Sequence, residues 1–193
     1  EKKFKLPKKY IYYPGMYLPH KNHKNLIDAL KIMKDNFNLK INVVFSGSDT
    51  GYKKNLINYA NKLGIQKDVI FLDFVEDEAL PYLYKNALAL VNLQLIGPTA
   101  IPPFEAFKMN VPAIVSELEG IKEVYGDAVF YVNPMSPQAI AAATKEVLEN
   151  NDLRLKLVKS GKKISEDIKE KDDYSQIFKI INDYRRIKST WVL

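Results

Sequence analysis

The 193-residue sequence contains no cysteine, only two histidines and one tryptophan. The absence of cysteine excludes disulfide bonds and thiolate metal sites, and it fits a reducing compartment. No run of about 18 apolar residues is present, so no membrane-spanning helix is predicted. The N-terminus lacks an initiator methionine and the apolar core of a signal peptide, so we expect a piece of a longer protein. These features predict a cytoplasmic protein, or one at the cytoplasmic face of a membrane.

The chain is basic, with 29 Lys and Arg residues against 23 Asp and Glu residues and a net charge of +6. The excess is spread along the sequence, which favours lysines on solvated helix faces over a nucleic-acid site. No RNP, zinc-finger or basic-arm pattern supports a nucleic-acid partner. The positive charge remains compatible with peripheral association of the protein with anionic lipid headgroups.

Apolar runs alternate with segments of helical spacing along most of the chain. The expected strands are 10–14, 41–45, 69–72, 88–93, 111–115 and 128–132. Strand-then-helix repetition with short connections predicts an α/β, doubly wound, mainly parallel sheet with helices on both faces. We expect one domain over residues 10–193, including a helical C-terminal tail, and a linker remnant over residues 1–9.

Local signals predict where several helices begin and end. Asn22 and Asp77 are expected helix N-caps, and Gly64 is an expected C-terminal stop. A last helix is expected from the helical spacing of Ile177, Ile181 and Tyr184.

The segment from Gly97 to Ala106 is the strongest functional signal. It follows an apolar run and leads into a helix, so backbone N–H groups and the positive helix end meet at a small-residue turn. Open α/β sheets bind anionic ligands at this position. Glu105 lies one to two turns into the helix, where it can reach a hydroxyl group beside the anion. An anion next to a polyol suggests a nucleotide or a nucleotide-sugar.

Other candidates lie at the ends of the expected strands. Gly15 ends the first strand, and Lys21 stands before the first helix, where an ammonium can offset charge on a leaving phosphate. Ser46 and Gly47 resemble part of a phosphate cradle but match neither a dinucleotide-binding nor a Walker A motif. The segment with Phe74 and Val75 is a candidate base pocket. Each of these residues can also be explained without a ligand, as an ordinary turn, core or surface residue.

The sequence offers little for metal or acid–base chemistry. His20 and His23 have H-x-x-H spacing, but no cysteine and few nearby carboxylates complete a metal site, so we predict none. No Ser-His-Asp set and no paired-carboxylate hydrolase pattern is visible. We expect one of the two histidines to cap or brace the loop instead, and His20 is a candidate phosphate contact.

The ordered set of motifs resembles the C-terminal half of a GT-B glycosyltransferase, in the large retaining group called group 1 or family four. The matching segments run in the family's order across nearly the whole chain. They are residues 19–23 (PHKNH), 69–75 (VIFLDFV), 101–106 (IPPFEA), 111–116 (VPAIVS) and 123–128 (EVYGDA).

The resemblance implies one Rossmann-like half of a two-domain enzyme, with this half holding the nucleotide-sugar donor and a missing N-terminal half holding the acceptor. Lys21 matches the lysine that contacts the donor diphosphate, and Glu105 matches the glutamate that binds the ribose. The backbone turn that faces the diphosphate and sugar corresponds to Thr99, Ala100 and Ile101. Phe74 and Val75 lie near the family's base-binding segment.

Two departures from the family pattern affect the site. The first glutamate of the family's E-x7-E motif is replaced by Gly97, which removes a carboxylate that normally contacts the sugar. Met16 stands where many members have a phosphate-binding arginine, so Lys21, backbone donors and Lys24 would carry more of the phosphate charge.

The resemblance implies a retaining hexosyltransferase of polysaccharide biosynthesis that needs no cofactor and no bound metal. The acceptor would be a growing glycan or a lipid-linked acceptor, and the isolated domain would be inactive. An epimerase of the same architecture is disfavoured because the acid–base carboxylates and histidines that it needs around the sugar are not found. A phosphorylase is disfavoured because its chain would be much longer. The alternative from another class is a non-catalytic nucleotide-binding or scaffold module, which the loss of the carboxylate at Gly97 favours.

Overall fold

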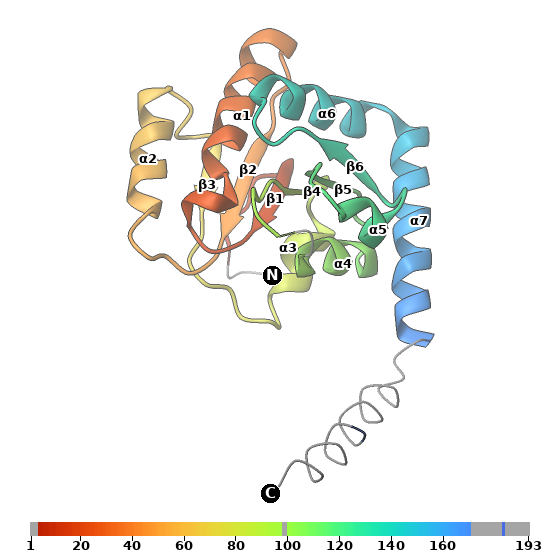
Figure 1. Ribbon diagram of the computed structural model, residues 1–193. Helices are drawn as coiled ribbons and strands as arrows, with labels where there is room; N and C mark the ends of the chain where they lie inside the picture. The colour runs from red at the N-terminus through yellow and green to blue at the C-terminus, as the bar shows by residue number, and fades with distance from the viewer. Residues whose placement is uncertain (1–3, 98–99, 171–182, 184–193) are drawn as a thin grey trace, which may run out of the picture.

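The computed structural model describes residues 4–97, 100–170 and 183. A six-stranded parallel sheet forms its centre (Figure 1), with strand order β3-β2-β1-β4-β5-β6. The strands are β1 (Tyr10–Pro14), β2 (Asn42–Ser46), β3 (Val69–Phe71), β4 (Ala89–Asn92), β5 (Ala113–Ser116) and β6 (Val129–Val132). The chain starts in the middle of the sheet and winds outward in both directions, so the doubly wound, Rossmann-like prediction is confirmed.

Helices cover both faces of the sheet (Figure 1). One face carries α1 (His23–Phe37), α2 (Lys53–Lys62) and α6 (Pro137–Glu149), and the other carries α3 (Leu80–Lys85), α4 (Ile101–Lys108) and α5 (Ile121–Tyr125). A 3-10 turn, η1 (Pro19–Lys21), precedes α1, and α7 (Asn151–Glu170) packs on α4 and α6. No helix of the described segments is long and apolar enough to cross a bilayer.

The strands are apolar on both sides because both faces of the sheet are buried. In β1, Ile11 and Tyr13 contribute to the core beneath α1 and α6, whereas Tyr10 and Tyr12 contribute to the core beneath α3 and α4. This alternation follows from the two-residue period of a strand. One hydrophobic core therefore packs on each face of the sheet, and the two cores fix the strands from which the loops of the site extend.

The local predictions had mixed outcomes. Gly64 lies just after α2 with φ of 69°, as a C-terminal stop requires. Asn22 occupies the N-cap position of α1, but its side chain donates to Pro134 O at 2.7 Å and caps nothing. The prediction for Asp77 was wrong, because α3 has Ala79 at its N-cap and no side-chain cap. The helix expected around residues 177–184 falls almost wholly outside the described residues.

Candidate functional site

The loops that follow strands β1 to β6 meet along one edge of the sheet, here called the carboxyl edge. Because all six strands are parallel, this edge collects residues that are far apart in the sequence. The candidate residues described there are Gly15, Lys21, Ser46, Gly47, Phe74, Val75, Ala100, Ile101 and Glu105. Thr99 lies outside the described residues.

Lys21 ends the 3-10 turn that connects β1 to α1. The hydroxyl of Tyr13 donates to the Lys21 backbone carbonyl and so ties this turn to the sheet. The Lys21 ammonium donates to Gln94 Oε1 at 3.0 Å, and partial burial lowers its pKa. Its partner is a neutral amide, so the positive charge of the ammonium is retained for an anion.

Glu105 lies in the second turn of α4 and is half-buried. Tyr84 of α3 donates its hydroxyl to Glu105 Oε2 at 2.5 Å, and burial together with this carboxylate raises the Tyr84 pKa. Both residues line an open pocket of about 200 Å³ between α3 and α4. One carboxylate oxygen is thus oriented by Tyr84, and the carboxylate lines the pocket.

The start of α4 has few free backbone donors. The Ala100 N–H donates to the Tyr125 hydroxyl at 2.9 Å, and that hydroxyl also lies 2.8 Å from Ala100 O. Pro102 and Pro103 carry no N–H. Ile101 therefore supplies the remaining N–H between positions 100 and 103. The helix dipole persists here, but a bound anion gains fewer hydrogen bonds than at an ordinary helix start.

The residues after β1 and β2 join the two loops to each other. Gly15 N donates to Ser46 O at 2.7 Å, and Gly47 N donates to Asp73 O at 3.2 Å. The Ser46 hydroxyl is buried against the Tyr12 hydroxyl at 2.6 Å. These hydrogen bonds hold the loops after β1, β2 and β3 together at the carboxyl edge. Contact of Gly15, Ser46 and Gly47 with a ligand stays a prediction.

The predicted base-binding segment follows β3. Phe74 is 63% exposed, whereas Val75 is buried in the core beneath α3. An exposed aromatic ring at the carboxyl edge offers a flat apolar surface on which a base can stack.

The two histidines differ in environment. His20 is half-buried in the 3-10 turn, and His23 is completely buried in α1 between the rings of Tyr13 and Phe45. Within the described segments no three His, Asp or Glu residues group as metal ligands do. His23 packs in the core between these rings, and a bracing role in the loop stays a prediction.

Burial makes His23 sensitive to acid. It lowers the pKa of His23 from 6.5 to about 4, with the nearby Lys21 ammonium adding to the effect. Backbone groups of Gly15 and Leu18 oppose the shift in part, although neither ring nitrogen forms a hydrogen bond of normal geometry with the described residues. The folded-state pKa lies below the unfolded value, so the stabilisation is complete above pH 6.5 and is lost as the pH falls toward 4.

We therefore expect His23 to reduce the free energy of unfolding by about 2 kcal/mol between pH 7.5 and pH 5. Urea unfolding at several pH values measures this slope. A His23→Phe variant keeps the ring stacking and removes the titration, so its slope over this range should be smaller than that of the wild type. Equal slopes would contradict the prediction.

Three residues of this edge were missed at the sequence level: Tyr84, Gln94 and Tyr125. Each orients a predicted site residue through a side-chain contact across the fold. One available signal was the position of Gln94, a polar residue directly after the apolar run 88–93. Tyr84 carried no signal because an aromatic residue at helical spacing indicates core packing. Tyr125 lies in the matching segment 123–128, but that match did not indicate a contact with Ala100.

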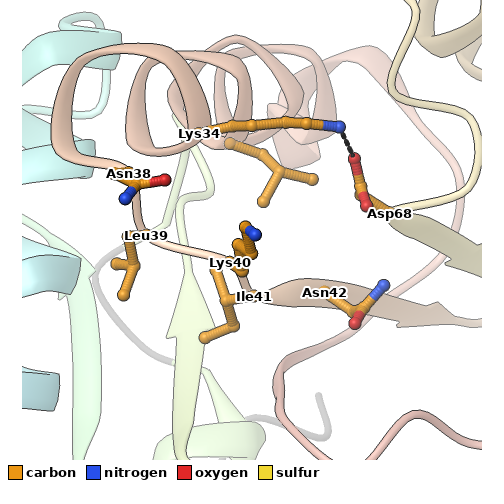
Figure 2. Close-up of a pocket in the computed structure, with 8 residues that line it drawn as sticks. Lys34, Asn38, Leu39, Lys40, Ile41, Asn42 and Asp68 are labelled. Atoms are coloured by element: carbon orange, nitrogen blue, oxygen red, sulfur yellow. Dashed lines mark hydrogen bonds and ion pairs between the residues drawn. The ribbon is translucent and has the colours of Figure 1, made fainter.

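A second pocket lies at the opposite end of the sheet (Figure 2). It has a volume of about 390 Å³ and lies between the end of α1 and the starts of β2 and β3. Lys34 donates to Asp68 at 2.6 Å across it. Lys34 is thus paired with a carboxylate, unlike Lys21 at the carboxyl edge.

Comparison with known proteins gives the family of the chain. The family model described as "Glycosyl transferases group 1" matches residues 1–164. The O-antigen chain mannosyltransferase RfbU of Salmonella typhimurium is 33% identical over 133 residues, which cover 69% of this chain and 36% of that protein. The chain spans less than half the length of the curated relatives it matches.

Solved structures show the same fold. The C-terminal domain of a glycosyl transferase group 1 protein (LpcC) from Francisella tularensis aligns with a TM-score of 0.71 and 22% identity, over 81% of this chain and 84% of that one. Anabaena HepE in complex with UDP and glucose aligns with a TM-score of 0.76 and 19% identity, over 93% of this chain and 48% of that one. The single Rossmann-like unit with its carboxyl-edge site is therefore one half of a GT-B architecture, and the chain belongs to the group 1 glycosyl transferases.

Proposed function

We propose that this chain is the nucleotide-sugar donor-binding half of a retaining hexosyltransferase. The observation that carries the proposal is the pairing of groups at the carboxyl edge. Glu105 directs a carboxylate toward the open pocket beside α3, and Lys21 holds an ammonium that forms no ion pair with any described residue. A carboxylate suits ribose hydroxyls and an ammonium suits a diphosphate.

In the proposed reaction the bond between the anomeric carbon and the diphosphate oxygen breaks. The acceptor hydroxyl oxygen bonds to the anomeric carbon on the same face, and its proton passes to the departing diphosphate. The Lys21 ammonium and the positive end of α4 stabilise the charge that develops on the leaving group. Phe74 stacks on the base, with Val75 beside it, and no metal or other cofactor takes part.

The acceptor is proposed to be a glycan or lipid-linked acceptor of polysaccharide biosynthesis, as the name of the matched O-antigen mannosyltransferase suggests. An N-terminal domain would hold this acceptor, since this chain matches less than half the length of these relatives. We place the protein in the cytoplasm or at the cytoplasmic face of a membrane, where its net charge of +6 favours contact with anionic lipid.

Calorimetric titration of the chain with GDP, UDP and ADP, without added metal, tests the donor site. We expect saturable binding of one nucleotide. We expect a Glu105→Ala variant to bind it about tenfold or more weakly, because the ribose loses a charged hydrogen-bond acceptor. Circular dichroism and thermal unfolding check that the variant stays folded.

The alternative is a non-catalytic module of the same fold, which the glycine at position 97 favours. Unchanged nucleotide affinity in Glu105→Ala would support that alternative and contradict the donor site. Loss of affinity with the fold intact supports the donor site.

A further inference from the structure

Gln94 connects two loops of the carboxyl edge through its side chain. It follows β4 and is 4% exposed. Its Oε1 accepts from Lys21 Nζ at 3.0 Å, and its Nε2 donates to Gly97 O at 2.7 Å. One amide thus joins the turn that carries the candidate phosphate-binding lysine to the turn that precedes α4.

The main chain reinforces this junction. Leu95 N donates to His20 O at 2.8 Å, so the segment after β4 is bonded to the 3-10 turn beside Lys21. Gly97 has φ of 88°, a conformation that favours glycine. The Gln94 amide therefore lies between two backbones whose positions are already restrained, and little conformational freedom is lost when it holds the lysine.

Lys21 differs from two other lysines at the carboxyl edge in the charge of its partner. Lys53 pairs with Asp73 at 2.6 Å and Lys122 pairs with Glu117 at 2.8 Å. Within the described residues Lys21 forms no such ion pair, and its partner is neutral. Because the start of α4 also lacks most of its N–H donors, Lys21 is the group best placed to meet a second phosphate.

We propose that Gln94 is a positioning residue that aims the Lys21 ammonium at the terminal phosphate of the bound nucleoside diphosphate. This inference rests on the proposed donor-binding function. It assigns to Gln94 two tasks: the Oε1 atom orients the lysine without neutralising it, and the Nε2 atom holds the Gly97 turn beside it.

The test uses calorimetry with whichever of GDP, UDP or ADP the wild-type chain binds best, and with the matching monophosphate. Gln94→Met preserves side-chain length and removes both hydrogen bonds. We expect diphosphate affinity to fall about tenfold and monophosphate affinity to change less than about twofold. In a Lys21→Ala background, Gln94→Met should weaken diphosphate binding no further. Gln66→Met, an exposed site before β3 at the other end of the sheet, is the matched control.

Gln94→Glu separates positioning from simple filling of space. The carboxylate still accepts from Lys21, but it neutralises the ammonium and loses the donor to Gly97 O. We expect diphosphate affinity to fall at least as far as in Gln94→Met, again with the monophosphate nearly unaffected. An amide with a purely structural role would instead give equal losses for both nucleotides.

The outcomes are separable. If the wild-type chain binds nucleotide and the Lys21 and Gln94 effects are additive, or both phosphates are affected equally, the positioning role is overturned and the donor site stands. If the wild-type chain binds no nucleotide, the donor-site function fails in this chain and the positioning role fails with it.

Discussion

Replacing Lys21 with alanine is expected to weaken binding of a nucleoside diphosphate to this chain by 10- to 100-fold, a loss on the order of 1.5 to 3 kcal/mol. The ammonium is partly buried and is held by a neutral amide, so its removal leaves the phosphate charge without its main counter-charge. The monophosphate should lose far less. Calorimetry at one fixed salt concentration measures both affinities, since ionic strength screens such contacts.

Lys34 provides the control for this experiment. It also makes a short side-chain hydrogen bond, to Asp68, but it lies at the opposite end of the sheet in the larger pocket of Figure 2. Lys34→Ala should leave nucleotide affinity unchanged. If instead Lys34→Ala weakened binding and Lys21→Ala did not, the nucleotide would occupy the pocket of Figure 2, and the carboxyl-edge assignment would be wrong.

The largest loss of stability is expected from Gly47→Ala. A Cβ atom at position 47 would lie 2.2 Å from Gly15 O, 2.5 Å from Gly15 C and 2.9 Å from Met16 N. These are backbone atoms of the loop after β1, which is itself bonded to Ser46 O. The clash cannot be relieved by a side-chain rotation, so we expect the free energy of unfolding to fall by about 3 kcal/mol or more, measured by urea unfolding.

Gly51→Ala is the matched comparison. Gly51 has φ of 100°, yet a Cβ there would meet no atom within 4 Å. Its replacement should cost only backbone strain, on the order of 1 kcal/mol. Similar losses in both variants would show that conformational strain, and not the contact with the Gly15 carbonyl, explains the need for glycine at position 47.

The close approach of Gly47 to Gly15 also affects the candidate site. Gly47 lets the loops after β1 and β2 approach each other, and the first of these loops leads to Lys21. Gly47 was predicted to be a phosphate-cradle residue. That role stays a prediction, but the structure shows that the Gly47 N–H donates to Asp73 O and so joins the loops after β2 and β3.

Much of the fold was predictable because its signals are local. The apolar runs of β1 to β6 and the helical spacing between them indicated the order of elements, and parallel strands with helical crossovers follow from that order. Lys21 and Glu105 follow β1 and β4 in the chain, which predicted that both lie toward the carboxyl edge. The N-cap expected at Asp77 failed because α3 starts three residues later from a turn with no side-chain cap.

The sequence by itself determined the class of fold, the family resemblance and the edge of the sheet where the candidate site residues gather. Only the tertiary structure decided which side chains orient them. Lys21 meets Gln94 from 73 residues away, and Glu105 meets Tyr84 from 21 residues away. Local periodicity sets the path of the backbone, whereas contacts between loops depend on strand register and on packing across both cores, to which the whole chain contributes.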